Sequence, residues 1–206
     1  MSSHKYTFIG LLTGWIVLPS FSEADSQWIE IESDMECTYY KGTDQKSGAI
    51  PLRAVCTWSI PAVTIQDTLE EFHNHAEIFS QLMKSEFVSK NHNTTLILQV
   101  HDFPGFTDRT VLMEFESEII ENGKRIHFRK ASTQTSLPPE LIEVSVNNGS
   151  WEILETANGS TVVFETSYSA GGYIPTFITN SFQLSGAKNI MTELKNNVNT
   201  QTPSGQ

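Results

Sequence analysis

The chain has 206 residues, of which 38% are hydrophobic, and this content suits one globular domain with a sizeable core. Its formal net charge of −11 argues against nucleic-acid binding, because phosphate contacts need a surface rich in lysine and arginine. The same charge disfavours simple electrostatic attraction to anionic membranes, although a transient membrane contact stays open. The sequence contains no internal repeat, Gly-rich phosphate loop or zinc-type cluster, so we expect no cofactor and no metal.

The first 24 residues have the layout of a secretory signal peptide. Lys5 provides a positive start, residues 6–21 are mostly apolar, and Ser22 and Ala24 stand at the −3 and −1 positions of a cleavage site. A retained membrane anchor is the alternative, but the apolar run is about 16 residues long and a spanning helix needs about 20. We therefore expect a secreted or periplasmic protein.

The two cysteines support export. Residues 28–40 and 50–59 have strand-like composition, and the polar stretch 41–48 joins them. In a hairpin of these strands Cys37 and Cys56 fall nearly opposite each other, so a cross-strand disulfide is geometrically plausible. Two free buried thiols are the alternative, and the export signal favours the disulfide.

A helical segment follows the second strand. Apolar side chains recur over 63–84, and this pattern predicts two short helices with a bend near Asn74. His73 and His75 flank the bend. Residues two apart point to different sides of a helix, and no third ligand stands at metal-binding spacing, so surface histidines are favoured over a metal site.

The next part of the chain predicts a meander of antiparallel strands. Asn122-Gly123 and Asn158-Gly159 are turn dipeptides, because asparagine and glycine tolerate a positive φ angle. The expected strands are 86–90, 94–101, 108–120, 124–133, 151–155 and 161–168, with a further strand opening at Ile142.

A long helix with one apolar face ends the chain. Apolar residues recur at roughly helical spacing from Ile174 to Leu194, and Pro175 suits the first turn. This order predicts an α+β fold in which a curved antiparallel sheet wraps around the terminal helix. We expect the domain to cover 25–196, followed by a flexible tail over 197–206.

Four segments carry a resemblance to a known family. They are 55–62 (VCTWSIPA), 103–109 (FPGFTDR), Trp151 with 159–162 (GSTV), and 171–175 (GGYIP) with Phe177, Ile178 and Asn180. These segments resemble parts of the START domain family (steroidogenic acute regulatory protein-related lipid transfer), especially its bacterial START-like members. That family usually has an acid after the arginine of the second segment, where this chain has Thr110. The resemblance covers about 28–196 and implies the helix-grip fold.

The resemblance also implies that the space between sheet and helix holds a lipid, a sterol or another hydrophobic ligand, carried or sensed by a monomer without chemistry. Core packing is the alternative for each apolar candidate, and a structural anchor is the alternative for Arg109. Gly171, Gly172 and Pro175 are candidates for the turn into the helix and for a gating hinge. The candidate ligand contacts are Arg109, Val111, Met113, Phe115, Phe128, Phe164, Phe177, Ile178, Phe182 and Met191.

Two other functions stay open. Helix-grip proteins include polyketide cyclases, and His101, Asp102 and Asp108 form the one suggestive titratable cluster, at an expected loop. The third possibility is a protein-interaction module with a filled core.

Overall fold

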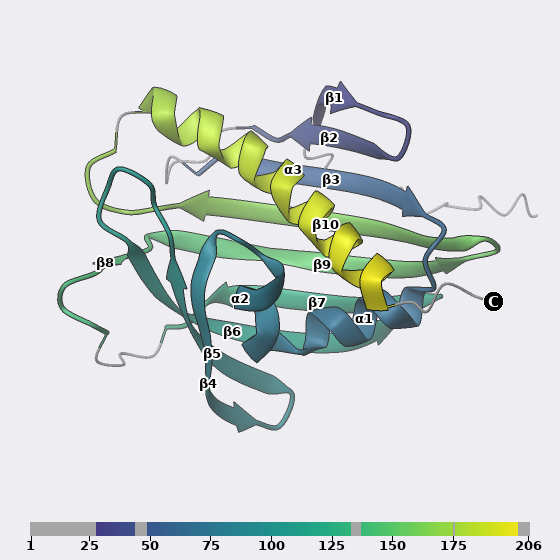
Figure 1. Ribbon diagram of the computed structural model, residues 1–206, viewed down its shortest axis with the longest axis horizontal. Helices are drawn as coiled ribbons and strands as arrows, with labels where there is room; N and C mark the ends of the chain where they lie inside the picture. Colours follow the sequence, from purple (N-terminus) through teal and green to yellow (C-terminus); the bar gives the residue numbers. More distant parts are fainter. Residues whose placement is uncertain (1–27, 44–48, 133–136, 175, 202–206) are drawn as a thin grey trace, which may run out of the picture.

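The computed structural model describes residues 28–43, 49–132, 137–174 and 176–201, with side chains throughout except over 176–184. Its strands form one sheet in the order β1-β2-β3-β10-β9-β7-β6-β5-β4, with β8 beside β6 (Figure 1). All strand pairs are antiparallel except β6 and β8. The strands are β1 (Ile29–Ser33), β2 (Cys37–Lys41), β3 (Pro51–Trp58), β4 (Leu82–Asn91), β5 (Thr94–His101), β6 (Arg109–Ile120), β7 (Gly123–Lys130), β8 (Ile142–Glu143), β9 (Val146–Thr156) and β10 (Gly159–Ser169).

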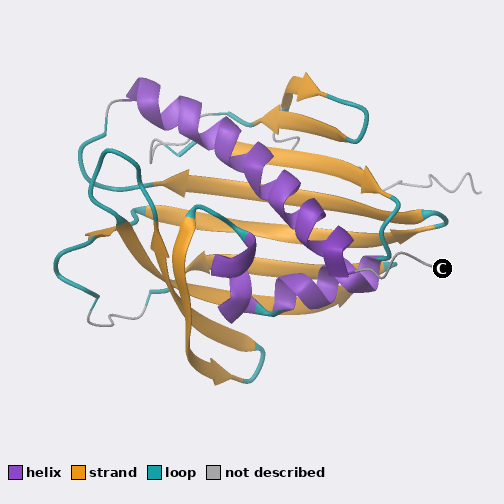
Figure 2. Cartoon of the chain, viewed as in Figure 1, coloured by secondary structure: helices purple, strands orange, loops and turns teal. Residues whose placement is uncertain are grey.

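The helices lie on one face of this sheet. The long helix α3 (Thr176–Gln201) crosses that face diagonally, and its C-terminal end lies next to α1 (Ala62–Glu70) (Figure 2). A 3-10 turn, η1 (Phe72–Asn74), leads from α1 into the short helix α2 (His75–Ile78), which confirms the predicted bend. In the described part of the chain, no helix is both long and apolar enough to cross a membrane. The predicted α+β architecture is confirmed.

Both predicted Asn-Gly turns are present. Asn122 has a φ of 60° between β6 and β7, and Gly159 has a φ of 143° at the start of β10. A Cβ atom at Gly159 would lie 2.1 Å from the carbonyl oxygen of Trp58, so glycine is also required there by the close approach of β3.

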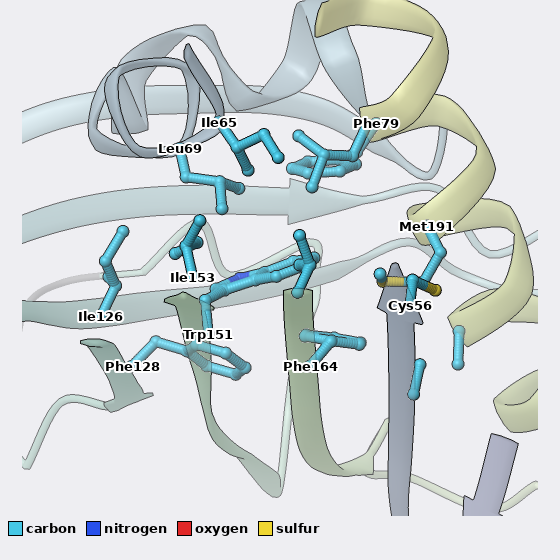
Figure 3. Packing of buried hydrophobic residues seen from close by; sticks show 14 of the residues in the cluster. Cys56, Ile65, Leu69, Phe79, Ile126, Phe128, Trp151, Ile153, Phe164 and Met191 are labelled. Carbon is cyan, nitrogen blue, oxygen red and sulfur yellow. The ribbon is translucent and has the colours of Figure 1, made fainter. Parts of the chain in front are cut away.

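The core lies between the helices and the inner face of the sheet. Alternate residues of β9 and β10 point inward, because successive side chains of a strand face opposite sides of a sheet. Figure 3 shows Trp151, Ile153 and Phe164 on the sheet facing Leu69 of α1 and Met191 of α3. All five are at most 5% exposed.

The first strand differs from the prediction, which treated 28–40 as continuous. The chain turns between β1 and β2 because Asp34 stabilises a tight turn. Its Oδ1 atom accepts hydrogen bonds from the backbone N–H groups of Glu36 and Cys37, both at 2.8 Å. The result is a short hairpin at the edge of the sheet.

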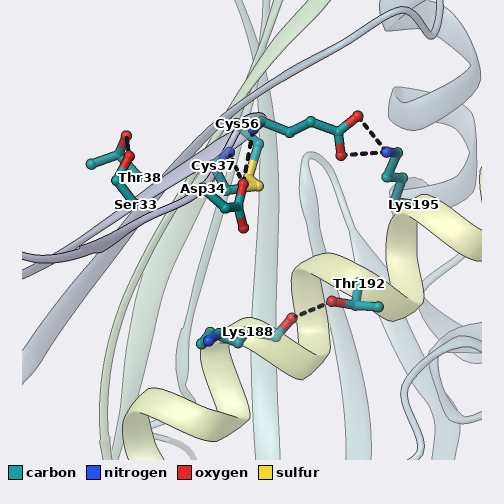
Figure 4. Close-up of a disulfide and its surroundings, with 9 residues drawn as sticks. Ser33, Asp34, Cys37, Thr38, Cys56, Lys188, Thr192 and Lys195 are labelled. Atoms are coloured by element: carbon teal, nitrogen blue, oxygen red, sulfur yellow. Dashed lines mark hydrogen bonds and ion pairs between the residues drawn. A yellow bond between two sulfur atoms is a disulfide. The ribbon is translucent and has the colours of Figure 1, made fainter.

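The predicted disulfide is confirmed. Cys37 of β2 and Cys56 of β3 are register partners, their Cα atoms are 4.1 Å apart, and their sulfur atoms are bonded (Figure 4). The hairpin that carries Cys37 also contacts α3 through two ion pairs. Lys188 approaches Glu32 to 2.5 Å, and Lys195 binds both carboxylate oxygens of Glu36.

The prediction of a flexible tail from residue 197 is wrong for its first part. Helix α3 continues to Gln201, and Val198 is completely buried. Val198 lies four residues after the buried Leu194, so it extends the same apolar stripe into the core. Residues 202–206 and the expected signal peptide lie outside the described part of the chain.

Candidate functional site

A cavity of about 390 Å³ lies between the inner face of the sheet, α2 and α3. This volume falls within the range of about 300–1,000 Å³ that is usual for small-molecule sites. Helix α3 contributes Ala187 and Ile190 to the wall, among others, and the strands of the sheet contribute the largest share of the described lining residues. Among the described side chains, seven phenylalanine, tryptophan and tyrosine rings line it: Phe79, Phe103, Phe115, Phe128, Trp151, Phe164 and Tyr168.

Four of the predicted contact residues lie in the cavity wall. Met113, Phe115, Phe128 and Phe164 come from β6, β7 and β10, and all are less than 10% exposed. The Phe128 and Phe164 rings stack with centroids 6.2 Å apart. Trp151, which the sequence favoured as a packing residue, stacks on Phe164 at 4.2 Å and also lines the cavity. These residues form a continuous apolar wall for a hydrophobic ligand.

Other predicted contacts lie elsewhere or outside the described side chains. Val111 and Met191 are almost fully buried but are not part of the cavity wall. They therefore occupy packed positions next to it. The side chains of Phe177, Ile178 and Phe182 and the whole of Pro175 lie outside the described residues, so their roles stay predictions.

Arg109 is also outside the wall, at the junction between β10 and α3. Its guanidinium donates hydrogen bonds to the carbonyl oxygens of Ala170 at 3.3 Å, Gly171 at 3.4 Å and Thr107. It also lies over the ring of Phe103, 4.4 Å from the centroid. Burial lowers the pKa of Arg109, but arginine remains protonated in proteins. These contacts match the structural anchor that the sequence left open.

The glycine pair beside this anchor has the expected backbone geometry. Gly171 and Gly172 have φ angles of 70° and 66°, in the left-handed region that favours glycine. A Cβ atom at Gly171 would also lie 2.4 Å from the carbonyl oxygen of Glu143. Both glycines are therefore needed for the turn into α3, and a hinge function stays a prediction.

The expectation of two surface histidines is wrong for His75. His73 is exposed, whereas His75 is 5% exposed and lines the cavity. The 3-10 turn before α2 changes the angle between successive side chains, so helical spacing did not predict its direction. Nε2 of His75 lies 2.9 Å from the carbonyl oxygen of Leu69, and burial lowers the pKa of His75 to about 4.

His101 is a second cavity histidine. Its ring stacks with that of Tyr168 at 5.7 Å, and its buried Nε2 atom has no hydrogen-bond partner among the described residues. Burial lowers the pKa of His101 to about 4 and raises that of Tyr168 to about 12, so both are neutral at pH 7. Asp102 also lines the cavity, whereas Asp108 accepts a hydrogen bond from the backbone of Phe103 at 3.2 Å.

Among the described residues, the uncharged polar part of the wall consists of Ser80, Gln81, Gln99, Asn147, Thr166, Ser185 and Asn189. The sequence contained a signal for Gln99, because it lies two residues from the buried Ile97 and therefore on the same face of β5. Among the described residues, no group of three or more potential metal ligands is arranged to hold an ion.

No family model matches the sequence, and no curated protein matches it. Solved structures do match. A STAR-related lipid transfer protein from Xanthomonas axonopodis is 14% identical with a TM-score of 0.76, covering 84% of this chain and 98% of its own. Human StAR-related lipid transfer protein 5 is 9% identical with a TM-score of 0.78, covering 86% and 89%.

Enzymes share the same architecture. The ZhuI aromatase/cyclase from a Streptomyces species is 13% identical with a TM-score of 0.59, covering 75% of this chain and 96% of its own. The chain thus has the START-like helix-grip fold that its sequence predicted, and similarities of this kind show the fold alone.

Proposed function

We propose that this START-like domain binds a lipid or another hydrophobic ligand in the cavity under α3 and carries or senses it without chemistry. The observation that supports this most is the aromatic and aliphatic wall of the cavity. Burial of apolar surface contributes about 25 cal/mol per Å², so such a wall can hold an apolar ligand with few polar contacts. Two structural neighbours, which cover 84% and 86% of this chain, are lipid transfer proteins by name.

We further propose that the protein acts outside the cytoplasm as a monomer, in transient contact with membranes. A buried disulfide persists in oxidising compartments, and cytosolic thiols are usually kept reduced. The signal-like layout of the first 24 residues supports the same location.

Catalysis of the cyclase type is the second candidate, and two observations favour it. The fold is shared with an aromatase/cyclase, and two histidines reach the cavity. Their pKa values near 4 argue for binding instead, because a general base works best with a pKa near the operating pH. A change in the chemical identity of the ligand on incubation would support the enzyme.

Native mass spectrometry of the protein, followed by extraction and identification of any released lipid, tests the binding function. The matched variants are Ala187→Phe, whose ring would occupy the cavity, and Thr192→Phe on the exposed side of the same helix. We expect lipid on the wild type and on Thr192→Phe and at least about tenfold less on Ala187→Phe, because the added ring displaces the ligand. Equal lipid on all three would contradict the cavity assignment.

A further inference from the structure

We propose that the cavity selects uncharged lipids that carry a hydrogen-bond donor, such as a hydroxyl group, with Nδ1 of His75 as the acceptor. The inference rests on the proposed lipid-binding function and assigns its ligand class. It depends on the tautomer of one histidine and on the distribution of charge around the cavity.

The tautomer of His75 follows from its one hydrogen bond. A carbonyl oxygen can only accept, so Nε2 must carry the proton that is donated to Leu69. In a neutral ring Nδ1 then has a free lone pair and no proton. This atom has no hydrogen-bond partner among the described residues. It is also not one of the unpartnered polar atoms that are completely inaccessible to solvent. Because His75 lines the cavity, we infer that Nδ1 provides the cavity with a group that can only accept a hydrogen bond.

The surroundings of His75 keep the ring neutral and fixed. Phe72, Phe79 and Phe115 contact it edge to face, with centroid distances of 5.4–5.7 Å. Burial among these rings disfavours the charged imidazolium, which agrees with its pKa of about 4. The packing fixes the position of the ring, and the hydrogen bond to Leu69 fixes which nitrogen is protonated. The lone pair of Nδ1 therefore has one fixed direction in which a ligand can donate to it.

The charges around the cavity disfavour an anionic head group. No described wall residue is a lysine or arginine, and Asp102 is the wall residue with a formal charge. The sequence of 176–184 adds no lysine or arginine. Arg109, which lies near the junction with α3, is occupied by three carbonyl oxygens and the ring of Phe103. A carboxylate or sulfate would thus be buried without a counter-ion, at a large cost.

A hydroxyl group satisfies both conditions. It donates to Nδ1 of His75, and it adds no charge. An ionised carboxylate has no proton to donate, so its oxygen atoms would face the lone pair of Nδ1. A pure hydrocarbon would fit the apolar wall but would leave Nδ1 without a partner.

The selectivity can be measured on the wild-type protein with ligands that differ only in the head group. Cholesterol competes with cholesterol sulfate, and 1-hexadecanol competes with palmitate, each at equal concentration and pH 7.5, with bound fractions read by native mass spectrometry. We expect the alcohol of at least one pair to bind about a hundredfold better than its anion. We expect 5α-cholestane, which lacks the hydroxyl group, to bind about tenfold more weakly than cholesterol if the sterol pair binds.

Two matched variants test the assignment to His75. His75→Gln retains a donor for the carbonyl oxygen of Leu69 and removes Nδ1, and His73→Gln makes the same change at the exposed histidine two residues earlier. We expect His75→Gln to reduce the preference for the alcohol over the hydrocarbon to less than about threefold. His73→Gln should retain the wild-type preference, and thermal melting of both variants checks that they are folded.

The outcomes separate the inference from the function on which it rests. Equal or better binding of the anions would overturn the inference and leave lipid binding intact. An unchanged preference in folded His75→Gln would overturn the role of His75. If the spectra show no bound lipid of either class, and extraction of the purified protein yields none, the inference and the proposed function both fail.

Discussion

Helix α3 packs against the sheet in two different ways along its length. From Met191 to Val198 its inward side chains are at most 1% exposed and fill the space solidly. One turn earlier, Ala187 and Ile190 border the cavity instead. One helix can thus stabilise the fold at its C-terminal end, where its side chains are closely packed, and provide a binding surface next to it, where a cavity separates it from the sheet.

The largest effect of a single substitution should come from the packed end. Leu194→Ala should lower the free energy of unfolding by about 2–5 kcal/mol, because it leaves a cavity in a solid core. Ile190→Ala, four residues earlier on the cavity side, should cost about 1 kcal/mol, because its side chain is only partly buried. Urea titrations followed by circular dichroism measure both values. Equal costs would remove the distinction between the two regions.

Acid should destabilise the protein through the two buried histidines of the cavity wall. His75 and His101 have pKa values of about 4 in the folded protein and about 6.5 when unfolded, so the unfolded chain binds more protons between these values. The free energy of unfolding is therefore at its full value above about pH 6.5. It decreases as the pH falls towards 4, by about 3 kcal/mol for each histidine.

Urea titrations between pH 7 and 4 test this. His75→Gln should lose about half of the pH dependence in this window, and exposed His73→Gln should retain all of it. A wild-type stability that stays constant from pH 7 to 4 would contradict the neutral, buried state of both rings.

The disulfide should contribute to the free energy of unfolding at the packed side of α3. The double variant Cys37→Ala/Cys56→Ala should lower the free energy of unfolding by about 3 kcal/mol, because the closed loop spans a sequence separation of 19 residues. The pairing of β2 with β3 should survive, so ligand binding should persist in the folded fraction. Adding a reductant to the wild type should lower the free energy of unfolding by the same amount. As a control, the reductant should leave the stability of the double variant unchanged.

The smallest effect should come from the ion pairs between the first hairpin and α3. Glu36→Gln should cost at most about 1 kcal/mol, because both partners are partly exposed and solvent screens their attraction. Glu32→Gln, which removes the pair with Lys188, is the matched comparison. The difference from wild type should decrease in high salt, and a loss of several kcal/mol would show that the hairpin holds α3 more strongly than exposed charges allow.

Local rules predicted much of the fold. The Cys37–Cys56 pairing followed from two strands joined by one polar stretch, since residues at nearly equal distances from a turn face each other. The inward positions of Met113 and Phe115 followed from the alternation of β6. The turn into α3 followed from Gly171 and Gly172, whose positive φ angles few other residues adopt.

The errors occurred where the chain leaves regular geometry. His75 follows a 3-10 turn, so a helical period did not predict its direction. Asp34 divides the first strand by accepting two backbone hydrogen bonds, a contact that competes with strand pairing. Val198 lies in a polar stretch of sequence, and its burial depends on α1 and the sheet being present beside it.

The sequence by itself determined the α+β order of elements, the disulfide, the turns and the apolar faces, because each depends on neighbours along the chain or on one strand register. The tertiary structure decided which apolar residues fill the core and which border the cavity. It also brought His75, His101 and Gln99 to one wall and directed Arg109 towards backbone carbonyls. These outcomes depend on distances between elements far apart in sequence, and no local period encodes such distances.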